Sequence, residues 1–348
     1  MLPATARDRT PPKIRKPRPV ALLLPGQGAQ HPGMAAGLYR HEPEFTAAVD
    51  DVLDHFGDEG ARIRADWLGE APPLVPLDDV RRAQPLLFAV DYGLARMVLG
   101  WGVRPAALLG HSAGELVAAA LAGVVSLSDA VAMVRERVRA AVRIPAGGML
   151  AVGLAAGHLA PYLTADVAIA AVNANQQTML AGSSAPLAAV AERLRHDGHV
   201  VLSVPATSPF HSPAMAPAAD AVAAAYRTVS LSPPATALYS GYTGSLMTPE
   251  DACSPRFWAR QITDTVFFAD ALDAMLAVED MVLMETGPRQ TLTAFARRHR
   301  AVRLGASAAV PLLPARPSTP GADRATARRA AETLTEEGHR LTRAAAHL

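Results

Sequence analysis

Gly110-His111-Ser112-Ala113-Gly114 follows a short apolar run, Ala106 to Leu109, and precedes a helical pattern that starts at Glu115. This order of strand, sharp turn and helix is the setting of a G-x-S-x-G nucleophile elbow, in which the serine lies on a strained corner. Glycines on both sides let neighbouring backbone approach without Cβ clashes. The stretch therefore predicts an α/β fold with Ser112 as the nucleophile, the alternative being an ordinary turn serine.

The flanking segments support the same fold class. Val20 to Leu24 is short, apolar and without alternation, which is typical of a strand buried on both faces of a sheet. Leu86 to Leu99 predicts a helix with a broad apolar face, and alternating strands and helices indicate an α/β layer architecture. Further elements are expected as a helix from Met215 and strands at Ala237 to Ser240 and Val282 to Glu285.

The middle of the chain predicts a second, smaller unit. One helix, Ala185 to Leu194, lies among closely spaced strand candidates, so residues 146–207 are expected to form an α+β unit inserted into the larger one. The division expected is a disordered basic leader (1–18), a large subdomain (19–145 and 208–312), a small subdomain (146–207) and a loose or helical tail (313–348). The strand candidates are Met149 to Leu154, Val167 to Val172, Thr178 to Ala181 and His199 to Val204.

Composition excludes several classes of protein. Of the 348 residues, 50% are hydrophobic and 19% charged, which argues against a disordered chain, and the net charge of +1 gives no overall basic field for nucleic acid. One cysteine, Cys253, allows neither an internal disulfide nor a cysteine metal cluster. Apolar runs are shorter than the roughly 20 residues of a membrane helix, and residues 1–19 lack the apolar core of a secretory signal. We therefore expect a cytoplasmic monomer without metal, membrane or nucleic acid.

A serine nucleophile needs a base, and the residues alone do not select it among eleven histidines. His211 stands out because Pro209-Phe210-His211-Ser212-Pro213 is a rigid loop bracketed by prolines. An acid partner cannot be chosen from the sequence. The turn Pro25 to Gln30 matches neither a P-loop nor a dinucleotide fingerprint. It can still offer backbone N–H groups to an anion, the alternative being a tight turn only.

Seven stretches together resemble the malonyl-CoA:acyl-carrier-protein transacylase family, and more closely the acyltransferase domains of modular polyketide synthases. The resemblance covers about residues 22–300 and implies an α/β-hydrolase-like large subdomain, an inserted ferredoxin-like small subdomain, and a site in the cleft between them. The stretches are LLLPGQGAQHPGM (22–34), RRAQPLLFAVDYGLARMVLGWGVRPAALLGHSAGELVAAALAGVVSLSDAV (81–131), GGMLAVG (147–153), AVNANQQTMLAG (171–182), PFHSPAM (209–215), FWARQITDTVFFADAL (257–272) and ETGPRQTL (285–292).

Roles follow from this resemblance position by position. Ser112 corresponds to the acyl-accepting nucleophile and His211 to its base, while the backbone N–H groups of Gln27 and Ala113 correspond to the oxyanion hole. Arg137 matches the arginine that pairs with the malonyl carboxylate, because a bidentate guanidinium suits a planar carboxylate. The alternative for Arg137 is a surface arginine on a helix.

Other positions bear on the acyl group. The resemblance places His111, Asn173 and Phe210 in the substrate site, and Phe210 matches the version of the motif that is typical of malonyl-specific enzymes. Two departures leave the acyl specificity open. Ala113 is smaller than the family's usual residue after the serine, and Phe267 replaces a polar glutamine, which predicts a more apolar pocket edge.

The expected activity is that of a free-standing acyltransferase that serves a polyketide synthase. It would take an acyl group from acyl-CoA, such as malonyl-CoA, or from an acyl carrier protein, and pass it to the phosphopantetheine thiol of a carrier protein. No metal or bound cofactor is required. The alternatives are carrier-to-carrier transfer of a bulky acyl chain, an editing thioester hydrolase, and a non-catalytic docking module. Candidate carrier-docking residues, which could equally form a solvated helix end, are Arg297, Arg298, Arg300 and Arg303.

Overall fold

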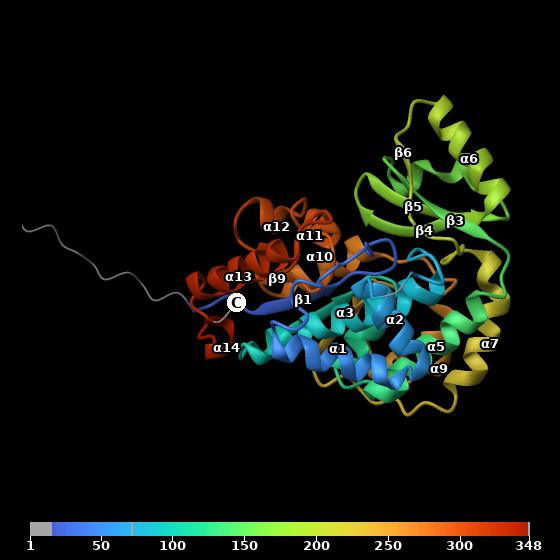
Figure 1. The fold of residues 1–348 in the computed structure, drawn as a ribbon. Helices are drawn as coiled ribbons and strands as arrows, with labels where there is room; N and C mark the ends of the chain where they lie inside the picture. The colour runs from blue at the N-terminus through green and yellow to red at the C-terminus, as the bar shows by residue number, and fades with distance from the viewer. Residues whose placement is uncertain (1–15, 71, 347–348) are drawn as a thin grey trace, which may run out of the picture.

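The computed structural model describes residues 16–70 and 72–346, which form a large and a small subdomain (Figure 1). The large subdomain contains a six-stranded sheet in which five neighbouring strands run parallel and the last is antiparallel. The fold class is therefore α/β, as predicted. In spatial order the strands are β10 (Ala308–Pro311), β9 (Val282–Glu285), β1 (Val20–Leu24), β2 (Ala107–Gly110), β7 (Ala237–Ser240) and β8 (Ser245–Leu246).

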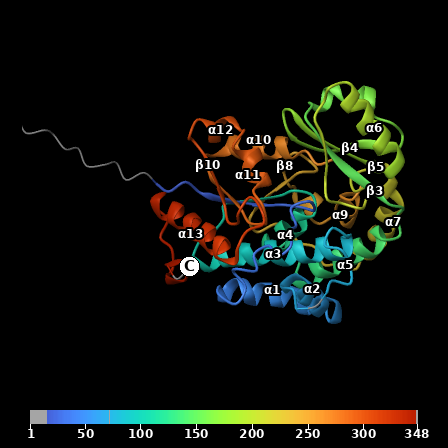
Figure 2. The ribbon, with the colours of Figure 1, turned by 45° about the horizontal axis from the view of Figure 1, so that its top comes forward.

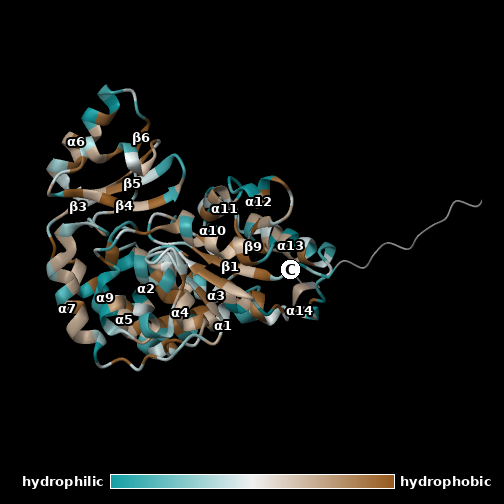
Figure 3. Cartoon of the chain, turned by 180° about the vertical axis from the view of Figure 1, so that it is seen from behind, coloured by the Kyte–Doolittle hydropathy of each residue, from teal (hydrophilic) through white to brown (hydrophobic). Residues whose placement is uncertain are grey.

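The central strand β1 is buried on both faces, as its sequence predicts, and hydrophobic residues run along it in Figure 3. Val20, Leu22 and Leu24 face one core, and Ala21 and Leu23 face the other, because side chains alternate along a strand. Helices contribute to both cores. The first core receives α1 (Pro43–His55), α2 (Asp58–Leu68), α3 (Val80–Gly100), α4 (Gly114–Leu121), α5 (Leu127–Ala141), α7 (Ala216–Tyr226), α8 (Pro249–Ala252), α9 (Pro255–Arg260), α13 (Pro320–Glu336) and α14 (Arg343–Ala346), and the second receives α10 (Phe268–Val278), α11 (Thr291–Ala296) and α12 (Arg300–Arg303).

The small subdomain is an antiparallel sheet covered on one face by α6 (Ser184–His196), as Figure 2 shows. Its spatial order, β4-β5-β3-β6, is the ferredoxin-like one. The first crossover is formed by two short 3-10 helices, Ala156–His158 and Ala160–Tyr162, in place of an α-helix. The strands are β3 (Gly147–Val152), β4 (Val167–Ala174), β5 (Gln177–Ser183) and β6 (Val201–Ser203).

Helix α3 is longer than its sequence pattern predicts, and the C-terminal tail contains a long helix, α13. α3 begins six residues earlier, at Val80, because the Asp79 side chain caps it by accepting the Arg81 N–H at 2.9 Å. α13 begins at Pro320, and its alanines pack into the first core.

The start of the described chain lies beside the end of α13. Residues 1–15 of the expected leader lie outside the described part, but Arg18 forms a salt bridge with Glu337, just beyond α13. The His339 ring also contacts the Arg18 carbonyl at 2.9 Å. The start of β1 and the end of α13 are therefore held side by side. Within the described residues, no helix is both long and apolar enough to span a membrane.

Candidate active site

Ser112 lies on the sharp turn between β2 and α4, the predicted elbow. Its φ of 54° falls in the left-handed region, which is unfavourable for a residue with a Cβ atom. A Cβ on Gly114 would lie 2.1 Å from the Leu24 carbonyl oxygen, and one on Gly110 would lie 2.3 Å from the Glu115 backbone. Both flanking positions therefore require glycine, and the packing around them fixes the strained serine.

The structure brings Ser112 and His211 together although 99 residues separate them. The Ser112 Oγ lies 2.6 Å from the His211 Nε2. On the other side of the ring, Nδ1 lies 2.9 Å from the Asp264 backbone carbonyl oxygen. A carbonyl only accepts, so Nδ1 carries the proton and Nε2 is free to accept from the serine hydroxyl. The partner that sequence reasoning could not choose is thus a backbone carbonyl, and the pair has the geometry of a serine–histidine dyad.

His211 is held as a neutral imidazole. Burial, together with the nearby positive charge of Arg137, lowers its pKa to about 3, while the hydrogen bond to the Asp264 carbonyl opposes this shift. The imidazole is therefore unprotonated at neutral pH, which is the form that a base requires. His211 also has a positive φ of 63°, and its N–H donates to the Ile262 carbonyl at 2.8 Å.

The expected oxyanion hole belongs to two touching turns. β1 and β2 pair in parallel with Leu24 opposite Gly110, so the Pro25–Gln27 turn and the elbow leave the same edge of the sheet. A Cβ on Gly26 would lie 2.5 Å from the His111 carbonyl oxygen and 3.3 Å from the Ala113 nitrogen. The backbone N–H groups of Gln27 and Ala113 thus belong to turns in van der Waals contact beside Ser112.

Arg137 is buried, so the interpretation as a surface helix arginine is wrong. Only 1% of the residue is exposed, and its guanidinium lies 5.0 Å from the centre of the Phe210 ring. Phe210 itself is buried beside His211. The Nε and Nη2 atoms of Arg137 have no hydrogen-bond partner among the residues that the structure describes. A buried cation with two unused donors on one edge is a ready site for a carboxylate.

Two functional candidates were missed by sequence reasoning, Glu115 and Tyr242. Glu115 is fully buried and accepts hydrogen bonds from Ser240, Gly241 and Gln261, so it fixes the loops after β7 and α9 against α4. Burial raises its pKa to about 8, against the effect of those hydrogen bonds. The Tyr242 ring lies 6.0 Å from the His211 ring. The only signal for Tyr242 was an aromatic residue two positions after a predicted buried strand.

The small subdomain closes the site through β4. The Asn173 Oδ1 lies 2.7 Å from the His111 Nε2, which joins β4 to the elbow. The Val172 N–H donates to the Val266 carbonyl, and the Val266 N–H donates to the Ala170 carbonyl. These two hydrogen bonds pair β4 with the segment just after Asp264, whose carbonyl contacts the His211 ring. Phe267 lies outside this buried group, with 37% of its surface exposed.

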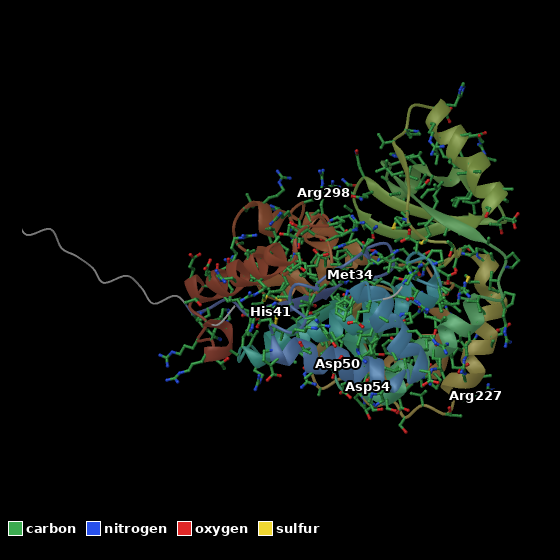
Figure 4. All side chains as sticks on the ribbon, viewed as in Figure 1. Met34, His41, Asp50, Asp54, Arg227 and Arg298 are labelled. Atoms are coloured by element: carbon green, nitrogen blue, oxygen red, sulfur yellow. The ribbon has the colours of Figure 1, made fainter. Side chains whose placement is uncertain are left out.

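Two neighbouring cavities lie beside the elbow. One of about 230 Å³ lies between the subdomains and is lined by Gln27, His111 and Asn173. The second, of about 800 Å³, shares Asn173 with it and is lined on the other side by Arg298 and Arg300. Arg298 lies in the turn between α11 and α12, and Figure 4 shows it on the side that faces the small subdomain. Its Nη1 donates to the Gln177 Oε1 at 2.6 Å.

The four arginines considered for docking, Arg297, Arg298, Arg300 and Arg303, are all at the surface, and Arg297 and Arg303 lie outside the second cavity.

Among the described residues, no group of three or more histidine, cysteine or acidic side chains is placed to hold a metal ion. A serine with a neutral histidine acts by nucleophilic attack on a carbonyl. Fold and dyad together define an enzyme that handles acyl groups.

Comparison with known proteins agrees with this class. The family described as the acyl transferase domain matches residues 22–333. A phenolphthiocerol/phthiocerol polyketide synthase protein of Mycobacterium tuberculosis (strain ATCC 25618 / H37Rv) is 41% identical over 282 residues, 80% of this chain. This chain spans only 19% of that relative.

Solved structures show the same likeness. The acyltransferase domain from the second module of the salinomycin polyketide synthase superposes with a TM-score of 0.85 at 30% identity, covering 96% of this chain and 76% of that one. The acyltransferase domain of SpnD, in complex with 2-(pent-4-yn-1-yl)malonyl, gives 0.86 at 30% identity, covering 97% and 80%. This chain belongs to the acyl transferase domain family and is an acyltransferase of the polyketide synthase type.

Proposed function

We propose that this enzyme transfers a malonyl group from malonyl-CoA, through an ester on Ser112, to the phosphopantetheine thiol of an acyl carrier protein in polyketide biosynthesis. The observation that carries the proposal is the buried guanidinium of Arg137, whose Nε and Nη2 are unused within the described chain. Leaving a charge buried without a partner is costly, so such a group is expected to be completed by its ligand.

The chemistry of Arg137 favours an acyl group with a free carboxylate. The Nε and Nη2 hydrogens lie on one edge of the guanidinium and match the two oxygens of a carboxylate. A neutral acyl chain would leave both donors unpaired. The similar SpnD domain was solved with a substituted malonyl group, which supports a malonyl-type substrate here.

The mechanism follows from the dyad. The His211 Nε2 accepts the Ser112 proton while the Oγ attacks the thioester carbonyl carbon, and the carbonyl oxygen becomes an oxyanion. The N–H groups of Gln27 and Ala113 stabilise this charge; loss of one such donor typically costs about 10²–10³ in rate. The carbon–sulfur bond then breaks, and the imidazolium gives its proton to the leaving thiolate. The carrier thiol reverses these steps against the acyl-serine ester.

The acceptor is expected to approach through these two neighbouring cavities. Arg298 and Arg300 line the outer one, which adjoins the inner one at Asn173. Phosphopantetheine carries a phosphate, and carrier proteins are typically acidic. A positive edge at this entrance, extended by Arg297 and Arg303, would attract both.

The test is a competition between malonyl-CoA, acetyl-CoA and a long-chain acyl-CoA, read as the mass of the acyl-enzyme. Wild-type enzyme should load malonyl preferentially. Arg137→Ala should reduce its preference for malonyl over acetyl by about 30- to 4000-fold, which corresponds to the roughly 2–5 kcal/mol of a buried charge pair broken on one side. The matched control is Arg139→Ala, which removes an exposed arginine from the same helix.

Other outcomes select the alternatives. Faster loading of the long neutral chain than of malonyl would favour carrier-to-carrier transfer of a bulky acyl group. Turnover without any acceptor thiol would favour an editing hydrolase. Absence of any acyl-enzyme would favour a non-catalytic docking module.

A further inference from the structure

Tyr242 is fixed in place by its backbone. It follows β7 on a turn where its own N–H donates to the Ser240 Oγ at 3.1 Å and the N–H of Gly241 donates to the Glu115 Oε2 at 2.9 Å. Glu115 is itself buried on α4, directly after the elbow. The direction in which the tyrosine leaves the turn is therefore determined by the same helix that carries the nucleophile.

The Tyr242 ring enters the acyl site beside the dyad. Its centre lies 6.0 Å from that of His211 and 6.5 Å from that of Phe257, with the second pair edge to face. The hydroxyl is buried, and no hydrogen-bond partner for it exists among residues 16–70 and 72–346. Burial raises the pKa of this phenol, while the charge of Arg137 and contacts with the Ser112 and Arg137 side chains act against that rise. The hydroxyl therefore keeps its proton at neutral pH.

Three buried donors that lie near one another have no hydrogen-bond partner among the described residues: the Tyr242 hydroxyl and the Nε and Nη2 of Arg137. A guanidinium cannot accept a hydrogen bond, so these two side chains cannot satisfy each other fully. Buried polar groups without partners are rare in folded proteins and call for an explanation. A carboxylate supplies two oxygens with about four lone-pair sites, which is enough for all three donors.

We propose that the Tyr242 hydroxyl is a third donor to the carboxylate of the acyl group, beside the two donors of Arg137, and that it selects acyl groups whose carboxylate lies one carbon from the thioester carbonyl. The hydroxyl neighbours both Ser112 and Arg137, so the acceptor must lie between the attacked carbon and the guanidinium. A malonyl group meets that condition because one methylene separates its two carbonyl carbons. This inference rests on the proposed function and adds a residue that determines specificity.

Tyr242→Phe tests the proposal because it removes only the hydroxyl. We expect kcat/KM for self-acylation by malonyl-CoA to fall about 10- to 100-fold, the size of one hydrogen bond to a charged group. Self-acylation by acetyl-CoA should change less than about threefold. Tyr239→Phe, on the preceding strand and also buried, is the matched control and should leave both rates unchanged.

The outcomes separate this inference from the function on which it rests. An equal fall for malonyl and acetyl, or no fall for malonyl, would overturn the role of Tyr242 while Arg137→Ala still removes the malonyl preference. If Arg137→Ala leaves that preference intact, the proposed function fails and the inference fails with it. In an Arg137→Ala background, Tyr242→Phe should have little further effect on malonyl, since the carboxylate is no longer anchored; a full additional loss would also count against it.

Discussion

This enzyme's site has a buried inner wall and an exposed outer wall, and the two differ in the contacts that hold their side chains in place. The inner wall, with the dyad and Arg137, is buried, and each group there is fixed by backbone or by packing. The outer wall, with Arg298 and Arg300, lies at the surface and is held mainly by surface contacts such as that between Arg298 and Gln177. The difference predicts that the proposed chemistry and the proposed partner recognition depend on separate residues, which substitutions can affect one at a time.

The inner wall also contains strained backbone. Both members of the dyad, Ser112 and His211, have positive φ angles. Such conformations persist only where the surroundings over-determine them, and they cluster at functional sites. The glycines beside Ser112 and the hydrogen bond from His211 to Ile262 supply that constraint. Substitutions of Ser112 or His211 should therefore slow the reaction with every substrate. Substitutions on the outer wall should slow only the reaction with the carrier protein.

The largest effect is expected from Ser112→Ala. It should abolish acyl-enzyme formation from any thioester, because no nucleophilic oxygen remains on the elbow. The melting temperature should not fall, since the substitution keeps the Cβ and adds no atoms. Intact-mass measurement after incubation with malonyl-CoA checks this, with the exposed Ser245→Ala as control. An adduct that still accumulates on another residue would contradict the assignment.

His211→Ala should come next. Loss of the base is expected to slow acylation about 10²- to 10⁴-fold for malonyl and acetyl donors alike. Rapid-quench measurement of acyl-enzyme gives the rate, and His158→Ala, an exposed histidine of the small subdomain, is the control. An unchanged rate would remove His211 from the mechanism.

A smaller and selective effect is expected on the outer wall. Arg297→Glu with Arg300→Glu should lower the rate of transfer to the carrier protein about tenfold at low salt and weaken its salt dependence, because rim charges mainly steer association. Self-acylation from a small N-acetylcysteamine thioester should hardly change. The control pair Arg62→Glu with Arg227→Glu makes the same charge change at other exposed positions, and Figure 4 shows Arg227 far from Arg298.

Two results would contradict a role of the outer wall in carrier binding alone. Equal losses with the carrier protein and with the small thioester would mean that the outer arginines support the fold of the site. Unchanged transfer to the carrier would place its docking surface elsewhere.

Asn173→Ala probes the junction between the subdomains. It removes the acceptor for the His111 Nε2–H, a hydrogen bond worth about 0.5–1.5 kcal/mol, so acylation should slow about 2- to 12-fold. Asn175→Ala, an exposed asparagine of the same hairpin, should have no effect on the small-thioester rate. A loss as large as that of His211→Ala would show that β4 takes a direct part in the chemistry.

The smallest effect is expected from pH. A protonated His211 cannot act as a base, and burial with the Arg137 charge lowers its pKa to about 3, so the active neutral form persists as pH falls from 7 to 5. Acylation by malonyl-CoA should change less than about twofold over that range, whereas a histidine with an ordinary pKa near 6.5 would lose about nine-tenths or more of its neutral form. An acid limb centred near pH 6.5 would contradict the buried, neutral imidazole.

The elbow and most of the strands could be predicted because their signals are local. Apolar runs indicated β1, β7 and β9, and the glycines of the elbow placed Ser112 between a strand and a helix. Family resemblance, not spacing, paired Ser112 with His211.

Other parts of the site have no sequence signature. The Asp264 group that orients His211 is a backbone carbonyl, which every residue possesses. The burial of Arg137 and the direction of Tyr242 depend on how distant segments pack, and neither can be read from neighbouring residues.

The contact of Arg18 with Glu337 and His339 has a consequence for how this enzyme can be joined to other polypeptides. The described chain enters β1 and leaves α13 at one place on the surface, so segments joined at these two points would start close together (Figure 1). Domains with adjacent ends can be inserted into longer chains without distortion of their interior. Segments attached here would share a single region of attachment at the end of the large sheet.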